Sequence, residues 1–413
     1  MMDTYLELNP NLPTEIRELR DSVHRFAREV MRPAAIAVDQ IADPQEAIAP
    51  GSPLWDFFRR AYSLGYHAAA IPVECGGLGL TGLGAQIFTE EMAWGAADLA
   101  LSLGVASFPF AALAMTGNSG LIERFVKPFV DDREARLIGC WPVTEPAHGS
   151  DWVFGLAGES ELEKTGWASI RSDGDSYVIN GQKAAWVSNG TIATHGLTFL
   201  ASVQGDGARL GGAIAFVPFD LPGVSRGKPL NKLGQRALNQ GPIFFDNVRI
   251  PSEYMLVGPE IFEPIATATL TRANGFMAAT FTGVARSAFE AALAYSKERV
   301  QGGKPICEHQ LVQKQLFEMF TCVEACRALS RAVIDYNDRM MASALEHAIA
   351  AKVFCTQASL DVASKALQIF GGNGLSKEYP IEKIFRDARA SLIEDGTNDV
   401  LSLAGARRIL GMA

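Results

Sequence analysis

The spacing of apolar residues changes twice along this chain of 413 residues, and this limits its fold more than any other feature. From residue 14 to about 135 apolar residues recur with the helical period; from about 138 to 262 they alternate with the period of a strand; after about 263 the helical period returns. The sequence therefore predicts an α+β protein that is mostly α. We expect an N-terminal helical domain (1–137), a central antiparallel β domain (138–262) and a C-terminal four-helix bundle (263–413).

Local signals suggest where elements begin and end. The first long helix is expected to end near Pro33, and a third helix is expected over 87–106. The segment Leu99–Ile122 carries no charge and has the length of a membrane span, but Pro109 and a polar run interrupt it. We expect two buried helices joined at Pro109 rather than a span.

The composition restricts the partners of the chain. A net charge of -9 disfavours a general binder of nucleic-acid phosphates. Six scattered cysteines form no disulfide framework, and together with the absence of a visible signal peptide they favour a reducing cytoplasm. Neither Cys322 and Cys326 nor the six histidines have the spacing of metal ligands. We expect no metal, no nucleic acid and no membrane among the partners.

Several short stretches carry residues suited to chemistry. In chain order they are "CWPVTEPAHGSD" (140–151), "AAWVSNG" (184–190), "LTRANG" (270–275), "KERVQGGKPICEHQLVQ" (297–313), "LQIFGGNGLSKEYPIEKIFRDA" (367–388) and "IEDGTNDV" (393–400). They combine short hydroxyls, an aromatic residue, an arginine, a glycine-rich turn and adjacent acids. As an ordered set spanning most of the chain, they resemble the acyl-CoA dehydrogenase family of flavoproteins.

The resemblance implies FAD as cofactor and assigns residues to its ring. Thr144 matches a hydroxyl on the pyrimidine side, and Ser150 matches a contact of both flavin and the substrate's pantetheine. Trp186 matches an aromatic residue that stacks beside the flavin, although a tryptophan after a strand is more often a core residue. Ser188 matches a hydroxyl that bonds flavin N5. The family usually has Gly-Ala-Gly before Ser-Asp, whereas this chain has Ala147-His148-Gly149; His148 is either a pocket residue or a solvated loop histidine.

The resemblance also assigns residues to the rest of the cofactor. Arg299 matches the arginine on the diphosphate, and an arginine fork suits that group. Gln310 matches an adenosine contact, whereas Gly302 stands where the family has an aromatic residue. Gln368, Gly371 and Gly372 match a turn through which another subunit approaches the diphosphate. A homotetramer, or at least a dimer, follows. Without the resemblance, these stretches are a charged helix end and a helix stop.

The acids at 394, 395 and 399 raise the question of which one is a base. In the family the local pattern is Tyr-Glu-Gly-Thr with Glu as base, so Asp395 takes the position of the base and Glu394 that of the tyrosine. Gly396 then lies at the substrate, and Thr397 and Asp399 match flavin contacts. Aspartate is shorter than glutamate by one C–C bond, roughly 1.5 Å. The proton it removes and its reach are therefore open.

Two further assignments keep alternatives. Arg272 matches a residue near CoA and is a candidate for binding its phosphate or adenine, but a buried ion-pair arginine fits the sequence as well. Some subfamilies place the base on the first bundle helix, where this chain has Thr271, which cannot serve. Glu394 is either a pocket wall or an ion-pair partner of Arg386 or Arg389.

The resemblance implies α,β-dehydrogenation of an acyl-CoA, with the proton going to Asp395 and the hydride to flavin N5, and with electrons passed to an electron-transfer flavoprotein. The aspartate keeps two other enzymes open: a related oxidase or monooxygenase acting on a substrate without CoA, and a dehydrogenase of a cyclic acyl-CoA. A non-catalytic flavoprotein scaffold is the remaining hypothesis.

Overall fold

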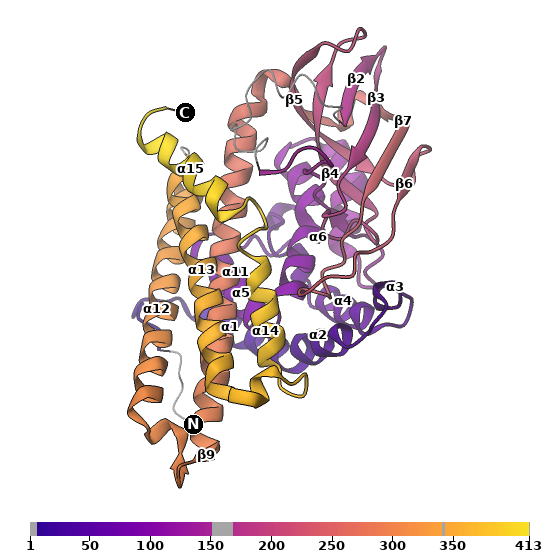
Figure 1. Cartoon of the computed structure of the whole chain (residues 1–413). Coiled ribbons are helices and arrows are strands. Elements are labelled where there is room, and N and C mark those ends of the chain that lie inside the picture. Colours follow the sequence, from indigo (N-terminus) through magenta and orange to yellow (C-terminus); the bar gives the residue numbers. More distant parts are fainter. Residues whose placement is uncertain (1–5, 151–167, 341–342, 413) are drawn as a thin grey trace.

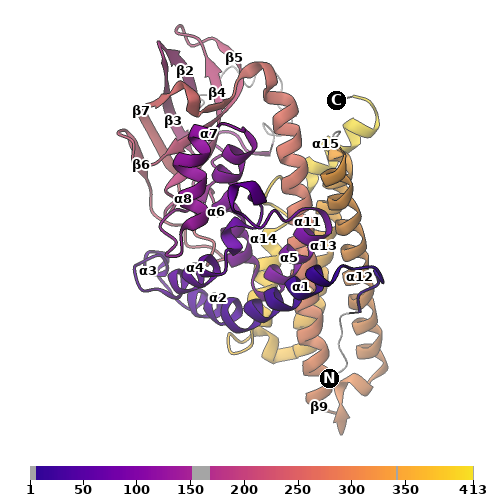
Figure 2. The same ribbon diagram turned by 180° about the vertical axis from the view of Figure 1, so that it is seen from behind.

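The expected order of three parts is present in the structure, a computed structural model that describes residues 6–150, 168–340 and 343–412 (Figure 1). A helical N-terminal part is followed by a sheet and then by long helices that run the height of the molecule. Seen from behind, the N-terminal helices lie beside both the strands and the long helices (Figure 2). The predicted fold class, α+β and mostly α, is confirmed.

The N-terminal part consists of short helices whose boundaries differ from the expected ones. They are α1 (Thr14–Phe26), α2 (Arg32–Asp39), α3 (Pro44–Ala47), α4 (Pro53–Ser63), α5 (Gly82–Gly95), α6 (Ala97–Met115), α7 (Ser119–Leu121) and α8 (Lys127–Asp131). The first helix does not end at Pro33, because a π-helical turn (Ala27–Met31) leads into α2, where Pro33 lies in the first turn. The predicted helix over 87–106 breaks at Ala96, which has extended backbone angles.

The prediction of two helices joined at Pro109 was wrong. Helix α6 continues through Pro109 and ends at Met115. Tertiary packing outweighs the local cost of an interior proline here, because β1 (Gly139–Cys140) lies against this side of the helix and a Cβ on Gly139 would come 2.5 Å from Pro109 Cδ. Among the described residues α6 is the one helix that is long and apolar enough to cross a membrane, and most of it is buried inside the protein.

The central part is one sheet with the strand order β6-β7-β3-β2-β4-β5-β8, in which β1 pairs with β4. The other strands are β2 (Ser169–Asp173), β3 (Ser176–Lys183), β4 (His195–Val203), β5 (Arg209–Pro218), β6 (Val224–Arg226), β7 (Ile243–Pro251) and β8 (Met255–Val257). Most pairs are antiparallel as expected, but β4 pairs in parallel with β1 and β2, so the sheet is mixed. The buried ring of Phe110 on α6 stacks on Phe129 at 4.0 Å and joins the sheet to the helices.

The C-terminal part contains α11 (Phe262–Glu298), α12 (Gln310–Arg339), α13 (Leu345–Phe370), α14 (Ile381–Ala390) and α15 (Asn398–Ile409). A two-stranded hairpin of β9 (Val300–Gln301) and β10 (Lys304–Pro305) joins α11 to α12. Helices α11, α12 and α13 pack on one another, and α5 packs against α11 and α12 from the N-terminal part. Helices α14 and α15 both pack on α13, so the loop between them is held against the bundle.

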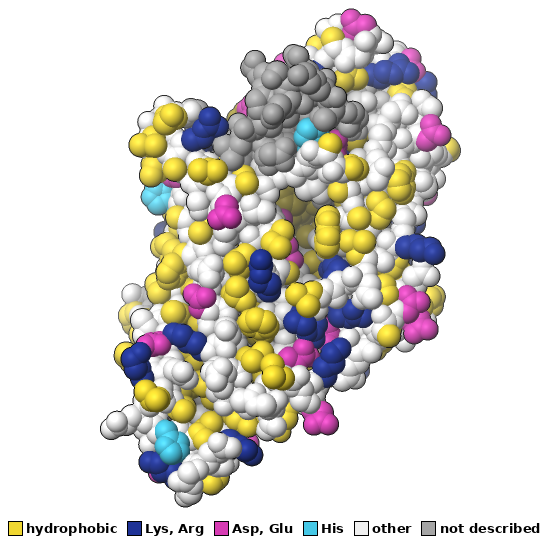
Figure 3. Space-filling model, in the orientation of Figure 1, with side chains coloured by type: hydrophobic (Ala, Val, Ile, Leu, Met, Phe, Trp, Pro, Cys, Tyr) yellow, Lys and Arg dark blue, Asp and Glu magenta, His cyan; other side chains and the backbone are white. Residues whose placement is uncertain are grey.

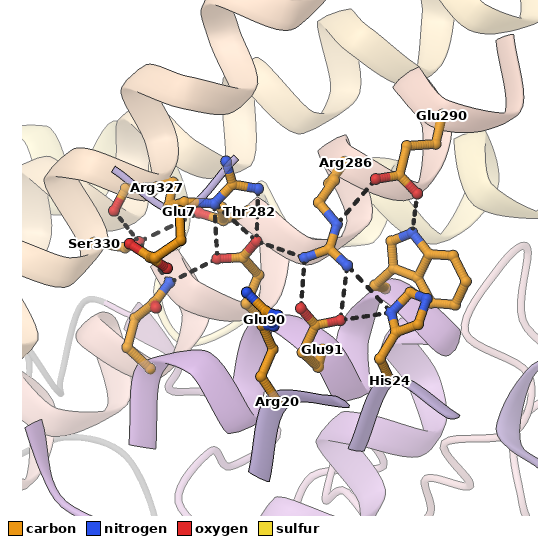
Figure 4. A network of polar contacts seen from close by, with 12 residues as sticks. Glu7, Arg20, His24, Glu90, Glu91, Thr282, Arg286, Glu290, Arg327 and Ser330 are labelled. Carbon is orange, nitrogen blue, oxygen red and sulfur yellow. Dashed lines mark hydrogen bonds and ion pairs between the residues drawn. The ribbon is translucent and has the colours of Figure 1, made fainter. Parts of the chain in front are cut away.

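A buried network of charges fastens α5 to the bundle (Figure 4). Arg286 of α11 pairs with Glu90 at 2.9 Å and with Glu91 at 2.7 Å, and Arg327 of α12 pairs with Glu90 at 2.9 Å. Burial alone raises the pKa of Glu90, but Arg327 and Arg286 outweigh it and bring the pKa to about 2. Because every charge here has a partner, the network holds the N-terminal helices in one register on the bundle.

Candidate active site

The loop between α14 and α15 is a tight turn built on two left-handed residues. Asp395 has φ of 49° and Gly396 has φ of 97°. Aspartate is one of the few side chains that adopts this region at modest cost, and glycine adopts it freely. Thr397 then caps α15, with its Oγ1 accepting from the backbone N–H of Val400 at 3.4 Å. The turn therefore is a helix cap as well, and the cap orients the residues before it.

The Asp395 carboxylate is available for chemistry. It makes no hydrogen bond or ion pair within the described ranges, and the backbone N–H groups of Asp395 and Gly396 likewise have no acceptor there. More than a third of Asp395 is open to solvent. Protein atoms nevertheless surround the carboxylate, so burial raises its pKa to about 6, while the charge of Lys352 acts in the opposite direction. A carboxylate of this pKa is ionised at neutral pH and still basic enough to accept a proton.

Glu394 has a different environment. Its Oε2 accepts from Gln235 Nε2 at 3.1 Å. Burial raises the pKa of Glu394 to about 7, and the charge of Asp395 adds to this, against the opposing effects of Gln235 and Lys232. The expected ion pair with Arg386 is absent, because Arg386 pairs with Asp39 at 2.7 Å and with Glu382. Glu394 is thus held by Gln235 and forms part of the wall of the site.

Gln235 connects this wall to the N-terminal part. Its backbone N–H donates to the buried carboxylate of Asp387 on α14, and the Lys383 ammonium binds both Asp387 and Asp98 of α6. The Lys383 Nζ to Asp98 Oδ2 distance is 2.8 Å, and Asp98 is completely buried. A continuous chain of polar contacts therefore runs from the turn, through the β domain, to α6.

The segment at 140–150 meets the turn directly. The Thr397 backbone N–H donates to Ser150 Oγ at 3.1 Å, and the Thr144 carbonyl accepts from Ala184 at 2.9 Å. A buried ion pair, Lys183 Nζ to Glu145 Oε1 at 2.7 Å, holds this segment in place. Burial lowers the pKa of Lys183, and the Glu145 charge opposes that effect. Asp151 and Trp167, which belong to the predicted motif and strand, lie outside the described residues.

His148 is buried at 7% exposure, so the hypothesis of a solvated loop histidine was wrong. Its backbone forms two hydrogen bonds with that of Glu145. These bonds close the turn of the 145–148 segment just before Ser150.

The segment at 184–190 presents an aromatic face and a hydroxyl. Trp186 is 61% exposed, which excludes the core role that a tryptophan after a strand usually has. Gln240 Nε2 lies 3.1 Å from the Trp186 carbonyl and 3.3 Å from Ser188 Oγ. Lys232 Nζ donates to Gln240 Oε1 at 2.7 Å and so sets the orientation of that amide. The exposed indole is suited to stacking on a planar ligand.

These contacts join four segments into a ring. The turn is hydrogen-bonded to the 140–150 segment, and that segment is hydrogen-bonded to the 184–190 segment. Ser188 is in turn hydrogen-bonded to the 235–240 segment, and Gln235 of that segment donates to Glu394, which closes the ring. On this face of the molecule the surface is hollowed between the bundle and the β domain (Figure 3). The residues brought together are Thr144, Ser150, Trp186, Ser188, Asp395, Gly396 and Thr397.

Other predicted residues form a second group at the opposite end of α13. Arg299 and Gln310 flank the β9–β10 hairpin, and Tyr295 stacks on Phe370 at 4.0 Å, which brings the end of α11 to the glycine turn. From Lys352 beside the turn to Gln368, α13 advances 16 residues, or roughly 24 Å. All five members are exposed, namely Arg299, Gln310, Gln368, Gly371 and Gly372. Gly371 has φ of 59°, and a Cβ on Gly371 or Gly372 would meet no atom within 4 Å.

Two other predicted residues, Arg272 and Asp399, lie on helices α11 and α15. Arg272 on α11 is exposed and makes no ion pair with any described residue, so the alternative of a buried ion-pair arginine was wrong. Thr271 is buried and bonds back to the Thr267 carbonyl at 2.7 Å. Asp399 is exposed in the first turn of α15, where a helix N-terminus favours an acid.

The residues that support the turn were not predicted from the sequence. Gln235 and Gln240 come from a loop of the β domain, and Lys352 comes from the middle of α13. Only Lys352 could have been suspected from the sequence, because a charged residue within the apolar run "AIAAKVFC" needs a buried partner. Nothing in the sequence indicated the glutamines.

Comparison with known proteins gives one family for all three parts. Residues 13–133, 140–248 and 264–410 match the N-terminal, middle and C-terminal domains of acyl-CoA dehydrogenase. The chain belongs to the acyl-CoA dehydrogenase family. It is 32% identical to cyclohexane-1-carbonyl-CoA dehydrogenase of Geobacter metallireducens over 97% of this chain and 98% of that protein. It is 30% identical to the short-chain specific acyl-CoA dehydrogenase of Rattus norvegicus mitochondria, over 97% and 91% of the two chains.

The fold agrees with that assignment. A glutaryl-coenzyme A dehydrogenase in complex with glutaryl-CoA superimposes with a TM-score of 0.83 and 27% identity, covering 98% of this chain and 97% of that one. Acyl-CoA dehydrogenases are FAD-dependent oxidoreductases that act on CH–CH bonds. The groups described above fit such a cofactor: an exposed indole, unpaired backbone N–H donors and short hydroxyls at one site, and an exposed arginine with open glycines at the other.

Proposed function

We propose that this acyl-CoA dehydrogenase removes the α-proton of an acyl-CoA thioester with Asp395 and passes the electrons to an electron-transfer flavoprotein. The observation that carries the proposal is the Asp395 carboxylate, which has no partner among the described residues and a pKa raised to about 6. Glu394 is the weaker candidate, because Gln235 already occupies one of its oxygens.

Each group of the turn has a role in this reaction. Asp395 accepts the α-proton, and its backbone N–H donates to the thioester oxygen, on which negative charge develops as the proton leaves. Ser150, Arg272 and Gly396 bind the substrate, with Arg272 on the CoA phosphate or adenine. The exposed Arg272 guanidinium supports this assignment.

FAD, when bound, supplies the acceptor for the β-hydrogen and its electron pair. Trp186 would stack beside its ring, while the hydroxyls of Thr144, Ser150, Ser188 and Thr397 would bond the ring's polar edge, with Asp399 nearby. The Gln240 amide, oriented by Lys232, holds Ser188 in place for this contact. These groups are fixed before the cofactor arrives, which lowers the cost of binding it.

The second group of residues supports an oligomer. Arg299, Gln310, Gln368, Gly371 and Gly372 lie roughly 24 Å along α13 from the turn of their own chain, so we propose that they bind the FAD of another subunit. Leu311 and Phe317 on α12 are 78% and 70% exposed, as expected of a helix covered by another copy. A homotetramer, or at least a dimer, follows, and light scattering of the purified holoenzyme tests it. All six cysteines are free, which supports a cytoplasmic location.

The acyl group is proposed to be short or cyclic. Glu394 and Gln235 form a polar wall beside Asp395, which is unfavourable for a long alkyl chain. Similarity to a cyclohexane-1-carbonyl-CoA dehydrogenase and to a short-chain enzyme points the same way.

A panel of acyl-CoAs tests the proposal. The purified holoenzyme is mixed anaerobically with butyryl-, glutaryl-, cyclohexane-1-carbonyl- and palmitoyl-CoA, and flavin absorbance is recorded. We expect bleaching with a short or cyclic member and the weakest response with palmitoyl-CoA. Absence of bleaching with every member, from a protein with full FAD content, would sink the proposal.

A second candidate is an oxidase or monooxygenase acting on a substrate without CoA. The shorter base favours it, since Asp395 stands where the family has glutamate. Turnover that consumes oxygen, needs no electron-transfer flavoprotein and proceeds on a small carbon acid lacking CoA would replace the first proposal with this one.

A further inference from the structure

Lys352 is a fully buried lysine in the middle of α13, and it points at the turn that carries Asp395. Its Nζ donates to the Gly396 carbonyl at 2.8 Å and to Asn398 Oδ1 at 2.8 Å. Asn398 is held in turn by Thr356, one helical turn further along α13, through a bond of 3.0 Å. A single ammonium group thus ties both residues that flank Thr397 to a rigid helix.

The turn needs such a tie, because no hydrogen bond to a described residue fixes Asp395 itself. Asp395 and Gly396 are both left-handed, and neither backbone N–H bonds another described residue. Before Asp395, Glu394 is held by Gln235 and by its own N–H on the Ala390 carbonyl. After it, the fixed points are the Thr397 N–H on Ser150 and the Asn398 N–H on the Leu392 carbonyl. Among the described residues, Lys352 is the one that binds the residue directly after Asp395, so it sets the direction in which the aspartate side chain leaves the backbone.

Lys352 also places a positive charge beside the acids. Burial lowers its pKa to about 8, and the charges of Asp395 and Glu394 oppose that effect. The charged groups that face this point are Asp395 and Glu394 of the turn, Lys232 from the β domain, and Lys352 itself. At neutral pH the ammonium form favours ionised Asp395, which is the form that accepts a proton.

We propose that Lys352 is the positioning residue of the active-site turn: by binding the Gly396 carbonyl and the Asn398 side chain, it holds the Asp395 carboxylate in the place and ionised form that proton removal requires. This inference rests on the proposed function of Asp395 as base. It also bears on how a base shorter by one C–C bond reaches its proton, because the anchored backbone, rather than the side chain, determines the reach.

Lys352→Met tests the proposal, because methionine has similar length but neither charge nor donors. Lys365→Met is the matched control: Lys365 lies on the same helix, half exposed, and pairs with Glu318 at 2.7 Å away from the turn. Three quantities are measured on the holoenzymes: amide hydrogen exchange of the peptide covering 391–400, the rate of flavin reduction with KM, and the pH profile of kcat/KM.

For Lys352→Met we expect exchange in the turn to be faster by about tenfold or more, since the anchor that closes it is lost. Flavin reduction should slow by about 100-fold at nearly unchanged KM, as for a misplacement of about 1 Å. The acid limb of the pH profile should move up by about one unit, because a nearby cation no longer favours the ionised base. Lys365→Met should match the wild type in all three.

Unchanged exchange together with an unmoved acid limb would overturn the proposal and reduce Lys352 to a packing residue. If Lys352→Met does not fold or retain FAD, Asn398→Ala replaces it, since it removes one of the two anchors and keeps the charge. It should speed exchange and slow reduction while leaving the limb in place, and wild-type exchange would count against the proposal. The exchange measurement needs no substrate, so it separates this inference from a failure of the wild type to oxidise acyl-CoAs.

Discussion

The pH dependence of kcat/KM should report Asp395. Burial raises its pKa from 3.8 to about 6, with Lys352 acting in the opposite direction, and only the ionised form accepts a proton. The raised pKa means that activity is lost as the pH falls through about 6. At pH 5 an acid of pKa 6 is about one-eleventh ionised, whereas one of pKa 3.8 is about 94% ionised. We therefore expect kcat/KM at pH 5 to be about tenfold below its plateau above pH 7.

The assay is anaerobic flavin reduction with the best acyl-CoA from the panel, recorded from pH 5 to 8.5, on the wild type and two variants. Asp395→Asn should lower the plateau by about 100- to 10,000-fold, the contribution of a general base. Glu394→Gln keeps a similar shape and removes a neighbouring negative charge. Its acid limb should therefore stay near 6 or fall slightly, and its plateau should remain within about tenfold of the wild type.

Two results would refute this reasoning. A limb near pH 7 that disappears in Glu394→Gln, while Asp395→Asn stays active, would make Glu394 the base, whose pKa is raised to about 7. A wild-type profile that is flat down to pH 5 would mean that burial does not raise the pKa of Asp395 in the holoenzyme.

Three further predictions concern the cofactor, the domain junction and the oligomer. Trp186→Ala should weaken FAD binding by about tenfold through the loss of stacking, and Trp186→Phe by less, measured by flavin fluorescence on dilution. Arg286→Met should destabilise the protein by about 3–5 kcal/mol in chemical denaturation, because Glu91 loses its buried arginine and Glu90 loses one of its two, whereas the exposed Arg28→Met should have little effect. Asp395→Asn and Arg299→Met subunits, each inactive alone, should regain activity when co-assembled if one site uses two subunits; no recovery would contradict that arrangement.

The three parts of the fold can be predicted from the sequence, because the spacing of apolar residues depends on which face of a helix or strand is buried. The two changes of period gave three regions in the right order, and the ordered motifs led to the family. The prolines mislead: Pro33 and Pro109 each predict a helix end, and each lies within a helix. In the structure a π-helical turn precedes Pro33, and Gly139 makes room for Pro109, and neither effect is visible without the tertiary neighbours.

The candidate site, like the fold, could be predicted only in part from the sequence. Trp186 is exposed and Asp395 is accessible, and their roles at the flavin and the substrate stay predictions; the residues that support them were not foreseen. Gln235 lies 159 residues from Glu394, and Lys352 lies 44 residues from Gly396. Contacts at such separations depend on how domains pack, which neither periodicity nor a short motif encodes.

The chain of contacts around the turn has a consequence for how the enzyme acquires activity. Glu394 reaches the β domain through Gln235 and then α6 through Asp387 and Lys383, while Lys352 fastens the same loop to α13. These tethers come from the N-terminal, central and C-terminal parts of the chain. We therefore expect the active site to form late in folding, after the three parts have packed together. During refolding, helical signal should recover before the capacity to turn over substrate, and the interval between them measures the docking of the three parts.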